Sequence, residues 1–270
     1  MTPSATGTSP AADGTPIFWR RWDAPADRPA VALLHSLALD GGMWEGVAAA
    51  LAGRARLLAV DCRGHGASGR VVGPYTTGLM ADDLAAVLDA QGWHAVTVAG
   101  CSMGGCVAQD FAARHAARVQ GLVPIDTTAW YGPEAASAWG GRAATAREKG
   151  FDALAPFQSE RWFTPAFNAA HPDVLTRWLG VFRANDVACY EAACAMLGAA
   201  DLRPLLWRIT ARTVVVVGEH DAATPPSMAR DLAAGIAGAT LRIIPGAKHL
   251  SPIEAPEAIA AAIAEVLPQG

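Results

Sequence analysis

The stretch AVTVAGCSMGG, residues 95–105, decides the fold. Its first half, Ala95–Ala99, is an apolar run of strand length, and apolar residues at helical spacing follow over Met103–Ala116. Between them, Ser102 stands among small residues, which are Gly100, Gly104 and Gly105. A G-x-S-x-G sequence between a strand and a helix is typical of a strained turn that exposes a serine hydroxyl for nucleophilic attack. An ordinary serine in a glycine-rich turn is the alternative, which this strand–turn–helix context disfavours.

Outward from this stretch, apolar runs of strand length alternate with helical stretches. The expected strands are Ile17–Trp22, Ala30–Leu34, Arg56–Val60, Gly121–Ile125, Thr213–Val217 and Leu241–Ile244. The expected helices are Met43–Ala52, Leu79–Ala90, Ser227–Ala234 and Pro256–Leu267. Most of the strands are continuous runs of Val, Ile, Leu and Ala, which indicates burial on both faces. The order predicts an α/β fold with a mostly parallel sheet flanked by helices.

The middle of the chain breaks this alternation. Residues 129–206 show helical periodicity without a Val- or Ile-rich strand, and they are rich in Trp and Phe. We expect a helical cap there, over the carboxyl ends of the strands, where ligands bind in open α/β sheets. Residues 15–128 and 207–270 then form the core, and residues 1–14 are expected to be a disordered tail.

Composition argues against several classes of protein. Hydrophobic residues make up 52% of the 270 residues and charged residues 17%, which favours a folded chain. The net charge is −4 and the arginines are scattered, so we expect no nucleic-acid partner. No apolar run is long enough to span a bilayer, and the first residues lack the pattern of a signal peptide, so we expect no membrane association. Five cysteines without a CxxC pair indicate reduced thiols and a cytoplasmic location.

A nucleophilic serine needs a base and an acid, in the chain order Ser, Asp, His for this architecture. The strand ending at Val217 leads to Asp221, and the strand ending at Ile244 leads to His249. Both side chains therefore belong to loops at the carboxyl ends of buried strands. We predict Asp221 as the acid and His249 as the base.

Other candidates for these roles are weaker. Asp126 also follows a strand, and some serine hydrolases take the acid from that position. His220 precedes the acid in the chain and lacks the late loop position, and Glu219 is expected to be structural. The seven histidines show no paired spacing, so we expect no metal.

The oxyanion of the tetrahedral intermediate needs two N–H donors. The N–H of Met103, at the start of the helix after the serine, is the first. The loop after Ala30–Leu34 should supply the second, and we predict the N–H of Leu37. His35 and Ser36 are expected to shape this loop through hydrogen bonds.

A second glycine-rich stretch imitates a dinucleotide site. Residues 64–69 read GHGASG, which matches G-x-G-x-x-G after a strand. No helix opens there, because Val71, Val72, Gly73 and Pro74 follow. The helix N-terminus that holds a pyrophosphate is therefore missing, and we expect a structured turn and no cofactor.

Taken together, these features resemble the α/β-hydrolase superfamily over about residues 15–267. They are LLHSL at 33–37, D-x-R-G-x-G-x-S at 61–68, G-x-S-x-G-G at 100–105, Asp221 and His249. More narrowly, the chain looks like the 3-oxoadipate enol-lactonases, through Met43-Trp44, the segment RWFTPAF at 161–167 and D-x-x-T-P-P at 221–226. It departs from that family at His35, where Asn is more usual, and at Ala38-Leu39, where Gly-Thr is expected.

The resemblance implies an eight-stranded sheet and the hydrolysis of a small lactone in aromatic-compound degradation. An enol-lactone with a free carboxylate needs a cation in an apolar pocket. Arg161 beside Trp162, with Trp130 at the entrance, is the predicted substrate-binding group, since a guanidinium binds a carboxylate bidentately. An arginine on the surface of the cap is the alternative interpretation.

Other functions on the same fold remain open. A general carboxylesterase, a carbon–carbon bond hydrolase of ring-cleavage products and an acyltransferase use the same serine, and a capped fold can also be a non-catalytic ligand receptor. Dehalogenases and epoxide hydrolases use an aspartate where this chain has Ser102. The expected partner is a small anionic lactone or ester, and the oligomeric state is undetermined.

Overall fold

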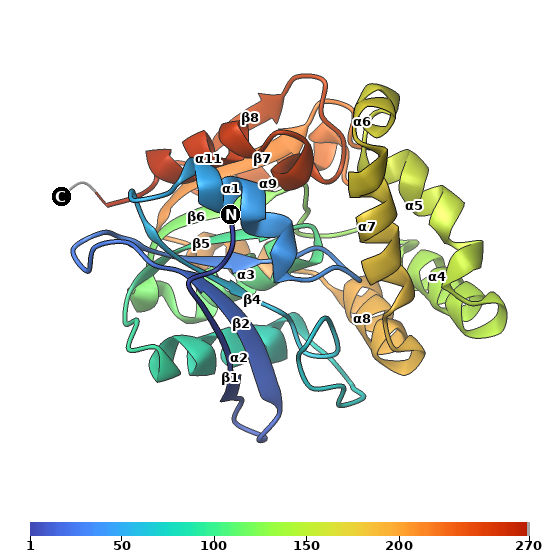
Figure 1. Ribbon diagram of the computed structural model, residues 1–270, viewed down its shortest axis with the longest axis horizontal. Helices are drawn as coiled ribbons and strands as arrows, with labels where there is room; N and C mark the ends of the chain where they lie inside the picture. The colour runs from blue at the N-terminus through green and yellow to red at the C-terminus, as the bar shows by residue number, and fades with distance from the viewer. Residues whose placement is uncertain (269–270) are drawn as a thin grey trace.

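The computed structural model describes residues 1–268, which form an eight-stranded sheet with helices on both faces and a group of helices at one end (Figure 1). The strands are β1 (Ala5–Pro10), β2 (Pro16–Trp22), β3 (Ala30–Leu34), β4 (Arg56–Val60), β5 (Val96–Cys101), β6 (Val119–Ile125), β7 (Arg212–Gly218) and β8 (Thr240–Ile244). Their order across the sheet is β1-β2-β4-β3-β5-β6-β7-β8. Strands β1 and β2 run antiparallel to their neighbours, and the other pairs are parallel. The α/β prediction is confirmed.

The central strands are apolar because both of their faces are covered. Every residue of β3 and β5 is buried, and so is nearly all of β6 and β7. Strand β8 lies at the edge of the sheet and is mostly exposed. Continuous apolar runs therefore marked the inner strands correctly.

Helices α1 (Glu45–Ala50) and α11 (Pro256–Glu265) pack against each other beside the sheet. Helices α2 (Thr77–Ala90) and α3 (Met103–Arg114) form a second pair. The short η1 (Gly41–Trp44) precedes α1 where one longer helix was expected, and η2 (Ala116–Arg118) follows α3. The glycine-rich stretch 64–69 opens no helix, because the next one begins at Thr77.

The insertion between β6 and β7 is helical. It contains α4 (Ala135–Lys149), η3 (Phe151–Ala153), α5 (Ala155–Trp162), α6 (Pro165–Ala170), α7 (Pro172–Arg183), α8 (Val187–Ala199) and η4 (Arg203–Arg208). Helices α4 and α8 pack closely together, and a bridge between Trp130 and Asp201 joins the two ends of the insertion. The chain then returns to the core at β7, and α9 (Pro226–Gly235) and α10 (Ser251–Glu254) follow β7 and β8. We call the residues from 129 to 206 the cap.

The expectation of a disordered tail over residues 1–14 is wrong. Strand β1 pairs with β2 along its whole length, from Ala5 opposite Arg21 to Pro10 opposite Pro16. Its sequence, ATGTSP, is polar because this edge strand is largely exposed, so it carries no apolar pattern. Main-chain pairing with β2 orders the segment in place of side-chain burial.

Among residues 1–268, we find no helix with the length and apolarity that a membrane crossing requires.

A buried ion pair ties this first hairpin to the core. The guanidinium of Arg63, which is 3% exposed, makes two hydrogen bonds of 2.6 Å to the carboxylate of Asp83 on α2. Its third contact, at 3.0 Å, is with Asp13 in the turn between β1 and β2. Arg63 therefore joins the 61–68 loop to α2 and to the hairpin.

Replacing Asp83 with Ala should lower the free energy of unfolding by about 3–5 kcal/mol, because the change leaves a buried guanidinium without its main partner. Asp82→Ala is the matched control, since Asp82 pairs with Arg114 at the surface and its loss should cost about 1 kcal/mol or less. Urea unfolding of both variants measures the difference. Equal costs for the two would contradict the role given to Arg63.

Candidate active site

The serine turn is held by close backbone packing. Ser102 has φ 54° and ψ −116°, a left-handed conformation that non-glycine residues rarely adopt, and its N–H donates to the carbonyl of Ile125 at 2.9 Å. A Cβ on Gly100 would lie 2.1 Å from the carbonyl oxygen of Gly104. A Cβ on Gly104 would lie 2.4 Å from the carbonyl oxygen of Leu34. Glycine is required at both positions because backbone, which cannot move aside, occupies the space.

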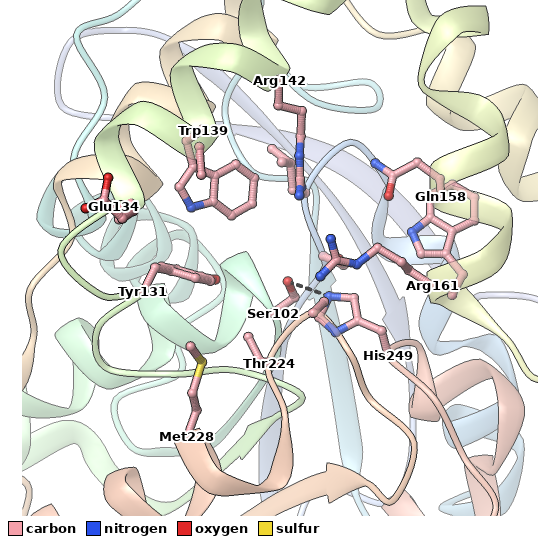
Figure 2. A pocket seen from close by; sticks show the side chains of 16 residues that line it. Ser102, Tyr131, Glu134, Trp139, Arg142, Gln158, Arg161, Thr224, Met228 and His249 are labelled. Carbon is pink, nitrogen blue, oxygen red and sulfur yellow. Dashed lines mark hydrogen bonds between the residues drawn. The ribbon is translucent and has the colours of Figure 1, made fainter.

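The three predicted catalytic side chains meet at the carboxyl ends of β5, β7 and β8. Figure 2 shows two of them, Ser102 and His249. His249 Nε2 lies 3.0 Å from Ser102 Oγ, and His249 Nδ1 lies 2.8 Å from Asp221 Oδ2. With its Nδ1–H donated to the carboxylate, the imidazole leaves Nε2 free to accept the hydroxyl proton of the serine. The geometry is that of a serine nucleophile, a histidine base and an orienting acid.

The carboxylate of Asp221 is fixed by further hydrogen bonds. Its Oδ1 accepts the N–H of Ala223 at 2.7 Å and the N–H of Thr224 at 3.0 Å. Its Oδ2 accepts the hydroxyl of Thr224 at 2.8 Å, beside the bond from His249. The loop thus prevents the acid from turning away from the imidazole.

Asp221 and His249 shift each other's pKa. Burial opposes the charged form of the imidazole, but the charge of Asp221 and its hydrogen bond outweigh this, so the pKa of His249 lies above its ordinary value. Burial likewise opposes ionisation of Asp221. The charge of His249, with its hydrogen bond and those of Thr224, outweighs that penalty and holds the pKa of Asp221 below the usual range.

Asp126, the alternative acid, has other partners. Its Oδ1 accepts the N–H of Gly218, and its Oδ2 accepts both the N–H and the hydroxyl of Ser251. Burial, together with the nearby charge of Asp221, raises the pKa of Asp126 to about 8. Asp126 therefore links the end of β7 to the segment that follows His249, and it makes no hydrogen bond to the imidazole within residues 1–268.

His220 and Glu219, the other candidates near the acid, lie outside the cavity. The side chain of His220 is 57% exposed, and Glu219 accepts the main-chain N–H of Gly246. The main-chain N–H of His220 donates to the carbonyl of Ala247 at 2.9 Å, so both residues connect the loop after β7 to the loop after β8.

The predicted oxyanion donors, Leu37 and Met103, belong to the loop after β3 and to the start of α3. Leu37 lines the cavity, and Met103 begins α3 directly after Ser102. Within residues 1–268, neither N–H donates to a main-chain carbonyl. His35 shapes the loop as expected: its Nε2 accepts the N–H of Cys62 at 2.8 Å, and burial lowers its pKa to about 4, which keeps the ring neutral.

The cavity above Ser102 has a volume of about 230 Å³. The core contributes Ser36, Leu37, Ser102, Ala223, Thr224, Met228 and His249, and the cap contributes Tyr131, Glu134, Ala135, Ala138, Trp139, Arg142, Gln158, Arg161 and Trp162. This size suits a small substrate. Arg161 and Trp162 are in the predicted place.

The prediction that Trp130 lines the entrance is wrong. Trp130 bridges Asp201 at the base of the cap, and the guanidinium of Arg203 stacks on its ring at 3.8 Å. Its neighbour Tyr131 lines the cavity instead. Adjacent residues in extended chain face opposite ways, so the pocket position was misjudged by one residue.

Arg142 is a cavity residue that the sequence interpretation missed. Arg142 and Arg161 come from α4 and α5, and both side chains line the cavity (Figure 2). Both guanidinium groups lie close to the ring of Phe157, at 5.0 and 4.6 Å. Neither forms an ion pair with a carboxylate of residues 1–268. Burial, with the charge of Arg142, lowers the pKa of Arg161. The spacing of Trp139 and Arg142, one helical turn apart, is a signal that could have identified it.

Residues 1–268 contain no group of three or more His, Cys, Asp or Glu side chains that could hold a metal ion.

The family described as the alpha/beta hydrolase fold matches residues 29–256. The chain belongs to this family. 3-Oxoadipate enol-lactonase 2 of Acinetobacter baylyi is 33% identical over 242 residues, 90% of each chain. Among solved structures, this α/β hydrolase is similar to the enol-lactonase from Burkholderia xenovorans LB400, with a TM-score of 0.91 and 34% identity over 96% of this chain and 99% of that one. A malate-bound thermophilic esterase from Thermogutta terrifontis has a TM-score of 0.89 and 29% identity over 97% of both chains. The resemblance to the enol-lactonases is confirmed.

Asp221→Asn should lower the pKa of His249, because the variant loses the charge that favours imidazolium. In the wild type we expect that pKa above 6.5, the ordinary value, so the base is protonated to a higher pH than a free histidine. An NMR titration of the His249 ring protons measures both values. An unchanged midpoint in the variant would contradict the electrostatic coupling described here.

Proposed function

We propose that this protein is a serine hydrolase that opens a small lactone bearing a carboxylate, namely 3-oxoadipate enol-lactone, to give 3-oxoadipate in aromatic-compound degradation. One observation carries the proposal: the hydrogen-bonded chain Ser102–His249–Asp221 borders a small cavity that also contains two arginines without carboxylate partners among residues 1–268. The three hydrogen-bonded side chains provide an activated nucleophile, and the two arginines favour an anionic substrate.

The reaction begins when Ser102 Oγ attacks the lactone carbonyl while its proton passes to His249 Nε2. The N–H groups of Leu37 and Met103 stabilise the tetrahedral oxyanion, and each such donor contributes about 3–4 kcal/mol to the barrier reduction. Collapse breaks the ring C–O bond, and the imidazolium returns its proton to the departing enol oxygen. An acyl-enzyme remains, with the former ring opened.

Deacylation repeats these steps with water. His249 takes a proton from water, the hydroxide attacks the acyl carbonyl, and Ser102 Oγ leaves with the proton that the imidazolium gives back. The new carboxylic acid is released, and the enol rearranges to the 3-oxo acid. Asp221 holds the imidazole tautomer and stabilises the imidazolium in both halves.

The free carboxylate of the lactone would bind the guanidinium groups of Arg161 and Arg142. Trp162, which is 3% exposed, adds an apolar ring to the lining of the same cavity. The enol-lactonases of Acinetobacter baylyi and Burkholderia xenovorans support the lactone substrate, and the malate-bound esterase is a relative that binds a small dicarboxylate. That esterase also favours a second candidate, an esterase acting on short carboxylate-bearing esters.

We also propose a cytoplasmic setting, because all five cysteines are unpaired, as is typical of a reducing compartment.

Ser102→Ala should leave the fold intact and lower turnover of 3-oxoadipate enol-lactone by about 10⁵-fold or more, since it removes the nucleophile. The lactone is followed by its absorbance, next to a panel of short esters that tests the esterase candidate. Retained turnover in the variant rules out the covalent route. A folded wild-type protein that hydrolyses neither the lactone nor p-nitrophenyl acetate would favour a receptor.

Arg142→Gln should raise KM for the anionic lactone by about 10-fold, because one charge-assisted contact to the carboxylate is lost. The comparison is Arg147→Gln, in the same helix but on its outer face, where Arg147 pairs with Glu191. Steady-state kinetics on both variants measures the effect. A KM equal to that of Arg147→Gln would remove Arg142 from the carboxylate site.

A further inference from the structure

The loop that carries His249 is hydrogen-bonded to the cap. The N–H of His249 donates to the carbonyl of Arg161 at 3.4 Å, and the N–H of Leu250 donates to the carbonyl of Trp162 at 3.1 Å. These two carbonyls belong to the last residues of α5. The catalytic base, His249, is therefore held in place by the cap as well as by the core.

Glu254 adds a second connection between the same parts. Its Oε2 accepts the N–H of Lys248 at 2.8 Å, and its Oε1 accepts the N–H and the hydroxyl of Thr164 at 2.9 and 2.5 Å. Thr164 is the residue before α6, two residues beyond the end of α5. The cap segment from Arg161 to Thr164 and the loop of His249 thus form one hydrogen-bonded unit.

The side chain of Arg161 reaches the other catalytic loop. Its Nη2 donates to the carbonyl of Ala222 at 2.7 Å, and Ala222 directly follows Asp221. Its guanidinium lies against the Phe157 ring. The Arg161 side chain lines the cavity with Ser102 (Figure 2). Its Nε is buried and has no hydrogen-bond partner among residues 1–268. One cap residue therefore touches both loops and the substrate cavity.

We propose that Arg161 is a positioning residue that holds the loops of Asp221 and His249 in register and couples the activity of the base to the anion bound in the cavity. This inference rests on the proposed serine-hydrolase function, and it does not depend on which lactone or ester is the substrate.

The coupling is electrostatic as well as mechanical. The charged groups that act on the imidazole are Asp221, Asp126 and Arg161, each from a different loop or helix packed around it. The two carboxylates favour imidazolium, and the guanidinium opposes it. A substrate carboxylate next to Arg161 offsets the positive charge, so the imidazole becomes more basic when an anionic substrate is bound. For an anionic substrate, kcat should then be higher and KM lower than for a neutral substrate of the same shape.

Two esters of matched shape separate positioning from binding. Ethyl butyrate and monoethyl succinate differ in that a carboxylate replaces a methyl group at the end of the acyl chain. Arg161→Gln should lower kcat for the neutral ethyl butyrate by about 10-fold, because a small displacement of the catalytic groups is costly, while its KM changes less than about twofold. A residue that only binds the carboxylate would leave kcat for this ester unchanged.

The pH profile gives a second readout. In Arg161→Gln, the acidic limb of kcat/KM for ethyl butyrate should move to higher pH, since the charge that opposes imidazolium is gone. Arg161→Lys should restore the limb towards the wild type, because Lys keeps the charge and can donate to Ala222. Arg142→Gln is the comparison within the cavity: Arg142 makes no hydrogen bond to either catalytic loop in the described residues, so its kcat loss on ethyl butyrate should be the smaller one.

An NMR titration of His249 tests the same inference without turnover. Arg161→Gln should raise the His249 pKa, and saturating succinate should raise it in the wild type but not in the variant. The inference is overturned when Arg161→Gln changes only KM for monoethyl succinate and leaves the pKa of His249 unchanged. Where the wild type hydrolyses neither these esters nor the enol-lactone, the proposed function fails instead, and the titration alone decides the role of Arg161.

Discussion

The left-handed backbone at Ser102 is the constraint on which the site depends. It can exist only because Gly100 and Gly104 let the turn press against neighbouring main chain, and because β5 lies in the buried centre of the sheet. The strain of such a residue has to be overcome by the structure around it. The same turn points Oγ towards the base and starts α3, so the nucleophile and the first oxyanion donor have one common origin.

The core could be predicted from the sequence because each of its inner strands is buried along nearly its whole length. Strands buried on both faces must be apolar nearly throughout. The predicted bounds of Ala30–Leu34 and Arg56–Val60 therefore agree with the observed strands at both ends. Asp221 and His249 could be found because parallel strands bring their carboxyl ends together. Strand β1 escaped notice, since an exposed edge strand is stabilised by main-chain pairing that leaves no apolar pattern.

The cap was less predictable. Its helices were expected, but which of their side chains reach the cavity depends on helix packing that no local pattern encodes. Trp130 is expected at the entrance, yet it bridges Asp201 where the two ends of the cap meet, and Tyr131 takes the cavity position. Arg142 was overlooked because its partner in the cavity, Arg161, lies on another helix. Substrate recognition is therefore the part of this site that the sequence leaves open.

The hydrogen bonds from α5 to the loop of His249 bear on how this enzyme could change during evolution. Replacement or lengthening of α5 would displace the base together with the pocket wall, so most such changes would be lost to selection before a new specificity arose. Helix α4 contributes Trp139 and Arg142 to the cavity from the far wall. Divergence towards other substrates should accumulate on α4, while the segment around Arg161 drifts slowly.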